Sequence, residues 1–529
     1  MIKLFLFISL FANFIYSQNF TQLAKDIDGE YEGDASGRCV AISDDGQTIA
    51  IAARWNDGNG VDAGHVRIFE IINGNWFQLG QDIDGVAAGD YSGHSIALNG
   101  NGDIVAIGSP NNDENGINSG HVRVFQLIGN SWIQLGKNIL GVSYENYSGQ
   151  SISLNFEGNI LAIGSYGNDE NGIDAGEVRV FKFQSSNMCI DSSLISSFCL
   201  CPMIYAPVCA CNGIVYSNDC LAQCDGNTNW GAIDMDLIPG DSCFLFAGDW
   251  IQIGQDLNGD SSHDLFGRPV AIDSSGNKVI IASTMNDING NNSGQVKVYN
   301  LINDSMWIQE GSSLYGESSG DLFGTSLDIS NDGKIIAIGA KKNDGNGSNS
   351  GHVRIFEFNN NNWLQLGQDI NGENVDDESG YSVSLSSRGH KIAIGAHKND
   401  GNGSNSGHVR IFEFNNNSWL QLGQDIDGES QDDWSGRSIA CSRNCDTIII
   451  GADLNDGNGN RSGHARVFYQ NVICTSPAIT GLGVNSIIHD RATLTFDDMN
   501  TSACRVDQLR IKYREVGTSS WSQKNMGSP

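Results

Sequence analysis

The sequence is poor in proline and in positive charge, and it lacks a long apolar run beyond its first residues. Its 529 residues include only 7 Pro against 65 Gly, a balance that favours many tight turns over a disordered linker. Lys and Arg number 30 against 62 Asp and Glu, which gives a formal net charge of −32 at pH 7. Because phosphate binding needs clustered Lys and Arg, we expect no nucleic-acid partner. We also expect no transmembrane segment, since no internal stretch is long and apolar enough to cross a bilayer.

Residues 1–17 have the pattern of a secretory signal peptide. Lys3 precedes an apolar run over residues 4–15, and Ser17 stands before the expected cleavage point. The alternative is a buried N-terminal strand. Eight of the 13 cysteines fall between Cys189 and Cys243, a density typical of a disulfide framework in a secreted chain. Both features predict a secreted, extracellular or cell-surface protein.

One phrase recurs seven times along the chain. Its copies open at Phe20, Trp76, Trp132, Trp250, Trp307, Trp363 and Trp419, in steps of 56, 56, 118, 57, 56 and 56 residues. The long step equals one repeat plus an insert of about 62 residues. A fixed period of this size indicates a repeat architecture.

Each repeat predicts four short strands, which we call A to D. In the repeat that ends near residue 426, they cover residues 382–385, 392–396, 408–414 and 419–426, separated by turns rich in Gly, Asn and Asp. No helical period interrupts them. Four antiparallel strands repeated in this way are the blades of a β-propeller.

The blade count predicts a ring closed by its own ends. The chain begins with a D strand at residues 20–27 and its last repeat stops after a C strand at residues 464–469. The N-terminal D strand therefore completes the seventh blade, which removes the open interface that a linear stack would leave. We expect an all-β fold: a seven-bladed propeller over residues 20–472, interrupted once, with a small disulfide-rich insert and a partial β-sandwich.

Several segments resemble the FG-GAP repeat of integrin-alpha-type propellers. They are residues 323–327 (FGTSL), 338–340 (IGA), 351–356 (GHVRIF), 266–267 (FG) and 108–110 (GSP). The resemblance implies a propeller and, in many members, a calcium loop between the first two strands of a blade. Here that place holds only short turns such as residues 330–333.

The insert, residues 187–245, lies between strands C and D of the third repeat, where a hairpin tip can accept a module without disturbing the sheet. Its cysteine pattern, from Cys201-Pro202 through Val208-Cys209 to Asp219-Cys220, resembles a Kazal-type module. Spacing alone does not fix the pairing. The resemblance implies the pairs Cys201–Cys220 and Cys209–Cys243, with Cys224 bonded to Cys189 or Cys199. It also implies an inhibitor reactive bond at Met203–Ile204; the alternative is a module that serves only as a spacer.

Residues 474–529 lose the repeat and resemble the first half of a fibronectin type III sandwich. About 56 residues is short for such a sandwich. Either the domain is incomplete or the chain is a piece of a longer one, which we favour.

The B–C loop of every repeat carries the pattern Asn-Asp-x-Asn-Gly. Its aspartates are Asp57, Asp113, Asp169, Asp287, Asp344, Asp400 and Asp456. Oxygen-rich loops of this kind suit calcium. The alternative, which we favour, is an Asx-turn in which the side chain caps its own backbone.

Two further positions repeat. The D–A loop holds Asp34, Asp90, Asp264, Asp321, Asp377 and Asp433, with Asn146 in the third repeat. These carboxylates either hold cations between loops or are solvated. Strand C begins with His65, His121, His352, His408 and His464. One blade separates each of these histidines from the next, so they cannot share one coordination sphere, and we interpret them as packing or hydrogen-bonding residues between blades.

No catalytic constellation stands out, so we expect no enzyme, no required cofactor and at most calcium as a bound ion. The favoured hypothesis is a binding or cell-adhesion protein that uses a propeller face to bind an extracellular protein or glycan. The alternatives are a serine-protease inhibitor acting through the Kazal-like module, and an extracellular propeller hydrolase or lyase.

Overall fold

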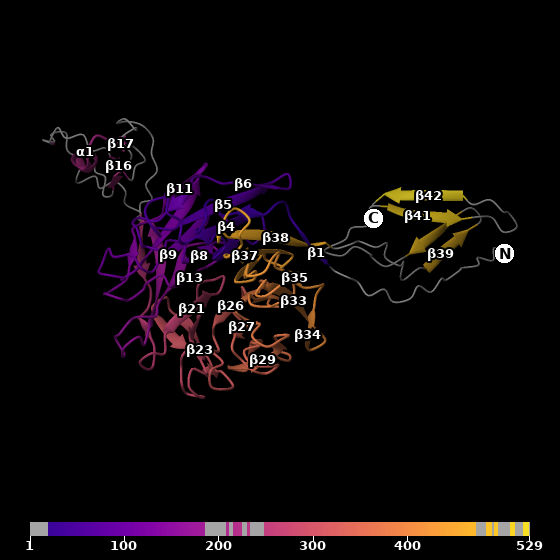
Figure 1. Ribbon diagram of the computed structural model, residues 1–529. Helices are drawn as coiled ribbons and strands as arrows, with labels where there is room; N and C mark the ends of the chain where they lie inside the picture. The colour runs from indigo at the N-terminus through magenta and orange to yellow at the C-terminus, as the bar shows by residue number, and fades with distance from the viewer. Residues whose placement is uncertain are drawn as a thin grey trace. The chain divides into compact units, whose positions relative to one another are not determined.

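The computed structural model describes residues 19–185, 201, 208–210, 215–224, 230–232 and 248–471, together with 483–488, 491–495, 508–513 and 522–527. The predicted signal peptide lies outside them. The chain divides into two compact units, one of residues Gln22–Tyr469 and one of Met1–Thr21 with Gln470–Pro529. The first unit is a seven-bladed β-propeller (Figure 1).

The first blade has the pattern of all seven. Its strands are β3 (Cys39–Ile42), β4 (Thr48–Ala53), β5 (His65–Ile72), β6 (Asn75–Gln78) and β7 (Ile83–Asp84). They pair antiparallel in the order β3-β4-β5-β6, and β7 pairs with the start of β5. Strand B is apolar and wholly buried, because both of its faces are covered by neighbouring blades.

The next five blades repeat this order. The second has β8 (Ser95–Leu98), β9 (Ile104–Ser109), β10 (His121–Ile128), β11 (Ser131–Gln134) and β12 (Ile139–Leu140). The third has β13 (Ser151–Leu154), β14 (Ile160–Ser165), β15 (Glu177–Ser185), β19 (Gly248–Gln252) and β20 (Leu257–Asn258). The fourth has β21 (Phe266–Ile272), β22 (Lys278–Ser283), β23 (Gln295–Ile302), β24 (Met306–Gln309) and β25 (Leu314–Tyr315). The fifth has β26 (Ser326–Ile329), β27 (Ile335–Ala340), β28 (His352–Asn359), β29 (Asn362–Gln365) and β30 (Ile370–Asn371). The sixth has β31 (Ser382–Leu385), β32 (Lys391–Ala396), β33 (His408–Asn415), β34 (Ser418–Gln421) and β35 (Ile426–Asp427).

The seventh blade closes the ring. It pairs β36 (Ser438–Cys441), β37 (Thr447–Ala452) and β38 (His464–Asn471) with β1 (Asn19–Gln22) and β2 (Ile27–Asp28) from the start of the chain. Leu23 N donates to Val467 O at 2.7 Å, and Ser438 Oγ donates to Gly37 O of the first blade at 2.7 Å. The predicted closure by the N-terminal strand is therefore confirmed.

The predicted fourth strand differs in one respect. Residues 419–426 do not form one strand but two, β34 and β35. Gly423 adopts a positive φ of 78° between them, which breaks the ladder because that conformation cannot continue a strand. The same interruption occurs in every blade and turns the chain toward the next D–A loop.

The tryptophan of strand D joins each blade to the one before it. Trp132 Nε1 donates to Leu79 O at 2.7 Å, and Trp419 Nε1 donates to Leu366 O at 2.8 Å. The apolar core is likewise shared between neighbours, since one cluster contains Ala50 and Val66 of the first blade with Ile107 of the second. Burial between blades thus holds the ring together.

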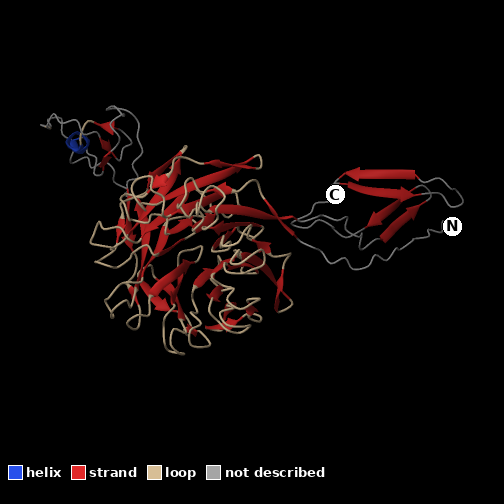
Figure 2. Cartoon of the chain, viewed as in Figure 1, coloured by secondary structure: helices blue, strands red, loops and turns tan. Residues whose placement is uncertain are grey.

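The insert lies in the C–D connection of the third blade, as predicted. Its described parts are β16 (Val208–Ala210), β17 (Val215–Tyr216), α1 (Asp219–Cys224) and β18 (Trp230–Ala232), in the sheet order β17-β16-β18. The described residues contain no other helix (Figure 2), and none of them forms a helix that could cross a membrane. The disulfide Cys201–Cys220 is present. Cys224 is also disulfide-bonded, whereas Met203, Ile204, Cys189, Cys199 and Cys243 lie outside the described residues.

One disulfide falls outside the sequence predictions, and the segment after the propeller forms strands. The disulfide Cys441–Cys445 spans the A–B turn of the seventh blade. After the propeller, β39 (Gly483–Ile488) pairs with β40 (Arg491–Thr495), and β41 (Gln508–Tyr513) pairs with β42 (Ser522–Gly527). These are two antiparallel hairpins, and a fibronectin-like domain stays a prediction.

Candidate functional site

The seven B–C loop aspartates cap their own loops. Asp57 Oδ1 accepts the backbone N–H of Asp62 at 2.8 Å, and each of the other six accepts the N–H five residues on at the same distance. This is the geometry of the structural alternative, in which a side chain fixes a turn. Calcium at these residues stays a prediction.

The D–A loop aspartates are buried, so the interpretation that they are solvated is wrong. Their exposed fractions are 2–4%. The asparagine 22 residues later, in the B–C loop of the same blade, donates to each of them, as Asn56 Nδ2 does to Asp34 Oδ2 at 3.0 Å. Backbone N–H groups complete the contact, for example Tyr31 N at 3.1 Å. The third blade has Asn146 in this place, and there Asn168 turns to Glu177 at 3.4 Å. The hydrogen bonds to these carboxylates thus join the D–A loop and the B–C loop of one blade.

The five strand-C histidines are buried, with exposed fractions of 0–2%. Among the described residues, His121 Nδ1 lies 3.5 Å from Glu114 Oε2 of its own blade, whereas His65, His408 and His464 lie 3.8–4.0 Å from the carboxylates that they face. A packing or hydrogen-bonding role between blades stays a prediction. The recurring positions are thus either buried or hydrogen-bonded within their own blade. The positions that differ gather in one other place.

That place is the end of the central channel on the side of the D–A and B–C loops. The A strands contact one another around the axis, and three positions per blade surround their starting ends. We call these residues, with the adjacent Trp55 and Lys398, the axial mouth. Two residues before the strand-A glycine stand Ala35, Tyr91, Tyr147, Leu265, Leu322, Glu378 and Trp434. Directly after that glycine stand Arg38, His94, Gln150, Arg268, Thr325, Tyr381 and Arg437. After strand B stand Arg54, Pro110, Tyr166, Thr284, Lys341, His397 and Asp453.

On one side of the axial mouth, an ion-pair network connects the seventh blade to the first, where the ring closes. Asp453 of the seventh blade is 2% exposed and lies 3.5 Å from Arg437 Nε and 3.6 Å from Arg38 Nη1. Arg437 in turn lies over the ring of Trp434, with its guanidinium carbon 4.4 Å from the ring centre. Arg38 comes from the first blade, so this network joins the two ends of the propeller.

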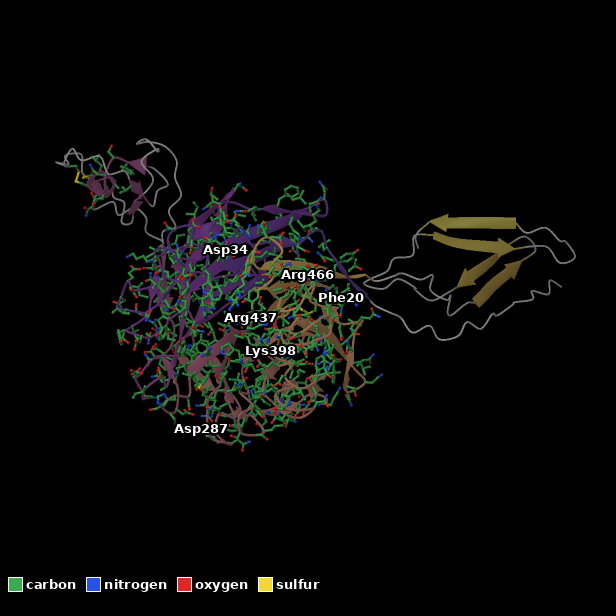
Figure 3. The ribbon with its side chains drawn as sticks, in the orientation of Figure 1. Phe20, Asp34, Asp287, Lys398, Arg437 and Arg466 are labelled. Carbon is green, nitrogen blue, oxygen red and sulfur yellow. A yellow bond between two sulfur atoms is a disulfide. The ribbon has the colours of Figure 1, made fainter. Side chains whose placement is uncertain are left out.

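A second group surrounds a buried histidine of the sixth blade. The ring of His397 lies 4.0 Å from that of Tyr381 and 5.3 Å from that of Trp434, measured between centres. Glu378 is 3.9 Å from His397 Nε2 and accepts from Lys398 Nζ at 2.7 Å. In Figure 3, Lys398 and Arg437 lie near the middle of the ring, whereas Asp287 of a B–C loop lies at its outer edge.

The remaining contacts complete the circle. Arg54 Nη1 lies 3.3 Å from His94 Nδ1 of the second blade. On the far side, Arg268 of the fourth blade lies over Tyr166 of the third at 5.3 Å. Tyr166 stacks on Tyr147 with ring centres 5.1 Å apart and an interplanar angle of 3°.

The electrostatics show that these groups share one environment. Burial, and then the cations Arg54, Arg38 and Arg268, lower the pKa of His94 to about 3. Burial, followed by Lys398, Lys341 and Arg38, lowers the pKa of His397 well below its ordinary value. Burial also lowers the pKa of Arg54 to about 10, with Arg38 adding to the effect. Both histidines are therefore neutral at pH 7, and cations from non-adjacent blades act on each of them.

The axial mouth has a local excess of positive charge. Six cations lie there, Arg38, Arg54, Arg268, Lys341, Lys398 and Arg437, against two carboxylates, Glu378 and Asp453, so the local charge is 6 − 2 = +4 in a chain of −32. Among the described residues, Arg54 Nε and His397 Nδ1 are buried without a hydrogen-bond partner. Such an arrangement can receive an anion, because guanidinium and ammonium groups bind carboxylate and sulfate oxygens through charge-assisted hydrogen bonds.

Two cavities elsewhere carry less chemistry. One of about 180 Å³ lies at the opposite end of the channel, between the A–B turns of all seven blades, and includes Asp44, Asp328 and Arg443. The other, of about 450 Å³, lies between the third and fourth blades and contains Lys182 among mostly neutral polar residues. Neither brings together the number of charged and aromatic groups found at the axial mouth.

Residues 316–356 and 371–412 match the FG-GAP repeat family, so the chain contains FG-GAP repeats. Among solved structures, it is similar to the β-propeller domain of Cps50 (Swd1) from Myceliophteria thermophila, with 10% identity, coverage of 85% of this chain and 99% of that one, and a TM-score of 0.46. It is also similar to the periplasmic gluconolactonase PpgL of Pseudomonas aeruginosa, with 13% identity, coverage of 74% and 85%, and a TM-score of 0.41. At these identities the likeness concerns the fold alone.

A short part of the chain matches a curated protein. Over 33 residues, 6% of this chain, it is 52% identical to a Kazal-type trypsin inhibitor of Aedes aegypti. The match spans 36% of the length of that relative.

Proposed function

We propose that this protein is a secreted or cell-surface binding protein whose axial mouth binds an acidic glycan. The observation that carries the proposal is the +4 charge of the axial mouth within a chain of −32. Its positions differ between blades that are otherwise near copies, which is what one asymmetric ligand requires. FG-GAP repeats, typical of extracellular proteins, support the same proposal.

The mixture of side chains favours a sugar acid over a simple ion. Trp55, Tyr166, Tyr381 and Trp434 offer aromatic faces beside the cations, and such faces supply apolar contact area at low entropic cost. Guanidinium groups match the planar carboxylate of a uronic acid or the oxygens of a sulfate ester. The surface outside the axial mouth is acidic and repels a polyanion. The electrostatic field of the protein therefore directs an acidic polymer toward the axial mouth.

A binding measurement on the full chain tests this. Polygalacturonate, alginate and a sulfated galactan are compared with neutral dextran by biolayer interferometry at two salt concentrations. We expect an acidic polymer to bind, dextran not to bind, and the affinity to fall with salt. Arg268→Ala and Lys398→Ala each remove a cation that is not fully buried and should weaken binding about tenfold or more.

Arg388→Ala is the matched control, because Arg388 is an exposed cation in an A–B turn on the opposite face. Its affinity should equal that of the wild type. If no acidic polymer binds, or if all three variants bind equally, the axial mouth is not the site. Release of new chain ends from a bound polymer would favour the hydrolase or lyase alternative, whereas capture of an acidic peptide alone would favour a protein ligand.

Protease inhibition is a second candidate, supported by the 33-residue match to a trypsin inhibitor. The Cys201–Cys220 disulfide braces the module, and a braced loop binds with little loss of entropy. We expect the full chain to inhibit a trypsin-, elastase- or subtilisin-type protease, and Met203→Asp to abolish that inhibition. Rapid cleavage at Met203–Ile204 without inhibition would reject this function.

A further inference from the structure

Four blades each bring one histidine and two carboxylates together at the outer part of the interface with a neighbouring blade. The trios are Glu30, His65 and Asp82; Glu317, His352 and Asp369; Glu373, His408 and Asp425; and Glu429, His464 and Asp26. In each trio, one nitrogen of the histidine and one oxygen of each carboxylate all lie within 4.8 Å of one another. We propose that each trio binds one divalent transition-metal ion, with Zn²⁺ as the representative ion.

The histidine is the first reason. His408 is 1% exposed, and its Nδ1 faces Glu373 Oε2 at 4.0 Å and Asp425 Oδ2 at 3.8 Å, too far for hydrogen bonds. Nδ1 therefore faces two carboxylate oxygens in a buried place without a hydrogen bond to either, and an ion between them would give this nitrogen a ligand bond. Donor atoms around a tetrahedral zinc ion lie about 3.4 Å apart, since the bonds are about 2.0–2.2 Å. The two distances from His408 Nδ1, 4.0 and 3.8 Å, are only slightly longer than this, so small side-chain rotations would bring both carboxylates onto one ion.

The second reason is that residues outside the trio orient both carboxylates. Arg410 Nη1 lies 3.6 Å from Glu373 Oε1, and Gln421 Nε2 donates to Asp425 Oδ1 at 2.6 Å. One oxygen of each carboxylate is thus occupied, and the other oxygen points to His408. The same arrangement holds in the first blade, where Arg67 and Gln78 take these two places. Such outer contacts are what fix metal ligands in position.

The third reason is that the three positions change together. The glutamate always precedes the histidine by 35 residues, and the other three blades have Val86, Val142 and Asp260 at that position. Those blades have also changed a second position. Asn138 replaces the aspartate in the second blade, Glu177 replaces the histidine in the third, and Gln295 and Ser313 replace both in the fourth. No blade keeps the histidine and aspartate without the glutamate, which is expected of residues that act on one ligand.

The ligand set selects the class of ion. Imidazole nitrogen with two carboxylate oxygens suits Zn²⁺, Mn²⁺ or Co²⁺, whereas calcium takes oxygen ligands only. Two carboxylates and one arginine have a net charge of −1, which attracts a divalent cation. Three protein ligands leave a tetrahedral ion one open position. These sites are independent of the axial mouth, which contains none of the twelve residues.

Metal content of the purified full chain tests the inference. The protein is dialysed against micromolar Zn²⁺ and the bound metal is measured by mass spectrometry, with Co²⁺ absorption as a probe of nitrogen and oxygen ligands. Asp425→Asn, which preserves size, should lower the bound metal by one ion per chain, and Asp369→Asn with Asp425→Asn should lower it by two. Ser313→Ala, at the same position of the fourth blade, is the control and should change nothing.

The contrast between these variants decides the outcome. Equal metal content in the wild type and in both Asp variants overturns the proposal, whether the content is zero or not. A loss that also occurs in Ser313→Ala overturns it as well, because it would reflect a general change in the propeller. Circular dichroism verifies that each variant is folded.

Discussion

The tryptophans of strand D offer a test of how the ring is held together, because the structure supplies an internal comparison. Trp132 is 3% exposed and its Nε1 donates to Leu79 O at 2.7 Å. Trp76 occupies the same position one blade earlier, but it is less buried and its Nε1 is 3.4 Å from Leu23 O. Replacing each by phenylalanine removes the same atoms from the same place. The two variants therefore differ in the hydrogen bond that is lost and in the burial of the ring that is replaced.

The magnitude follows from these contacts. Trp132→Phe loses a hydrogen bond worth about 1 kcal/mol and leaves a buried carbonyl unpaired. The smaller ring loses roughly another 1–2 kcal/mol of burial and packing. Trp76→Phe should lose only about 1 kcal/mol, since its hydrogen bond is long and its ring is only partly buried. The entropy of unfolding is roughly 2 cal/mol/K per residue, which gives about 1 kcal/mol/K for the unit Gln22–Tyr469. The shift in melting temperature is the lost free energy divided by this entropy. The melting temperature should therefore fall by about 2–3 °C for Trp132→Phe and by about 1 °C for Trp76→Phe.

Differential scanning calorimetry of the full chain at one scan rate resolves this difference. Equal shifts for the two variants would refute the view that the indole N–H contributes to the blade interface, and would assign the whole effect to ring size. A larger shift for Trp76→Phe would contradict the reasoning altogether.

Three further predictions concern the scaffold and the axial mouth. Gly254→Ala should lower the melting temperature by at least 2 °C, because its φ is +72° and the new methyl group would lie 2.5 Å from Trp307. Gly320→Ala is the comparison, since its φ is +89° but no atom lies within 4 Å of the new methyl group. It should cost only the backbone strain of about 1 kcal/mol. Asp400→Ala should cost about 1 kcal/mol by removing its 2.8 Å cap, and the loss should be the same with and without calcium if the cap is its whole role. Burial raises the pKa of Asp453 from 3.8 to about 6, so ionising it disfavours the folded state. Asp453→Asn should therefore gain stability relative to the wild type as pH rises from about 4 to above 6, and a flat difference in melting temperature over that range would reject this.

Most of the propeller could be predicted because the same pattern of strands and turns recurs seven times in the sequence. The spacing of Trp76, Trp132 and the later tryptophans fixed the blade number, and the position of the long step located the insert. The interruption of strand D was missed although Gly423 stands within it. Glycine is common in the turns of this chain, and nothing in one sequence distinguishes a glycine that breaks a strand from one that ends it.

The axial mouth escaped prediction for a different reason. A repeat pattern draws attention to residues that recur, whereas the position after the strand-A glycine holds different residues in different blades, such as Arg38, His94 and Tyr381. They lie far apart in sequence, and only ring closure brings Arg38 of the first blade to Asp453 of the last at 3.6 Å. A signal was present nonetheless, since the residue that follows strand B is different in all seven blades, although the strand itself is nearly constant. A list of such variable positions would have identified the site.

The histidines illustrate how far spacing arguments reach in a closed repeat. His65 and its equivalents are one blade apart, which excludes a single shared ion but not one ion for each. A histidine that binds an ion needs carboxylate partners of its own, whereas one that only packs does not. In most of the four blades these carboxylates lie 35 residues before the histidine and 17 residues after it. In the seventh blade the second partner is Asp26, from the opposite end of the chain. A metal ion there would bridge β38 to the N-terminal segment, so it would strengthen the closure at the only blade that is built from both ends. Asp26→Asn should then lower the melting temperature of the zinc-loaded protein more than Asp425→Asn does, while in a chelator the two variants should melt together. Identical shifts in zinc would show that the seventh site, if occupied, does not contribute to closure.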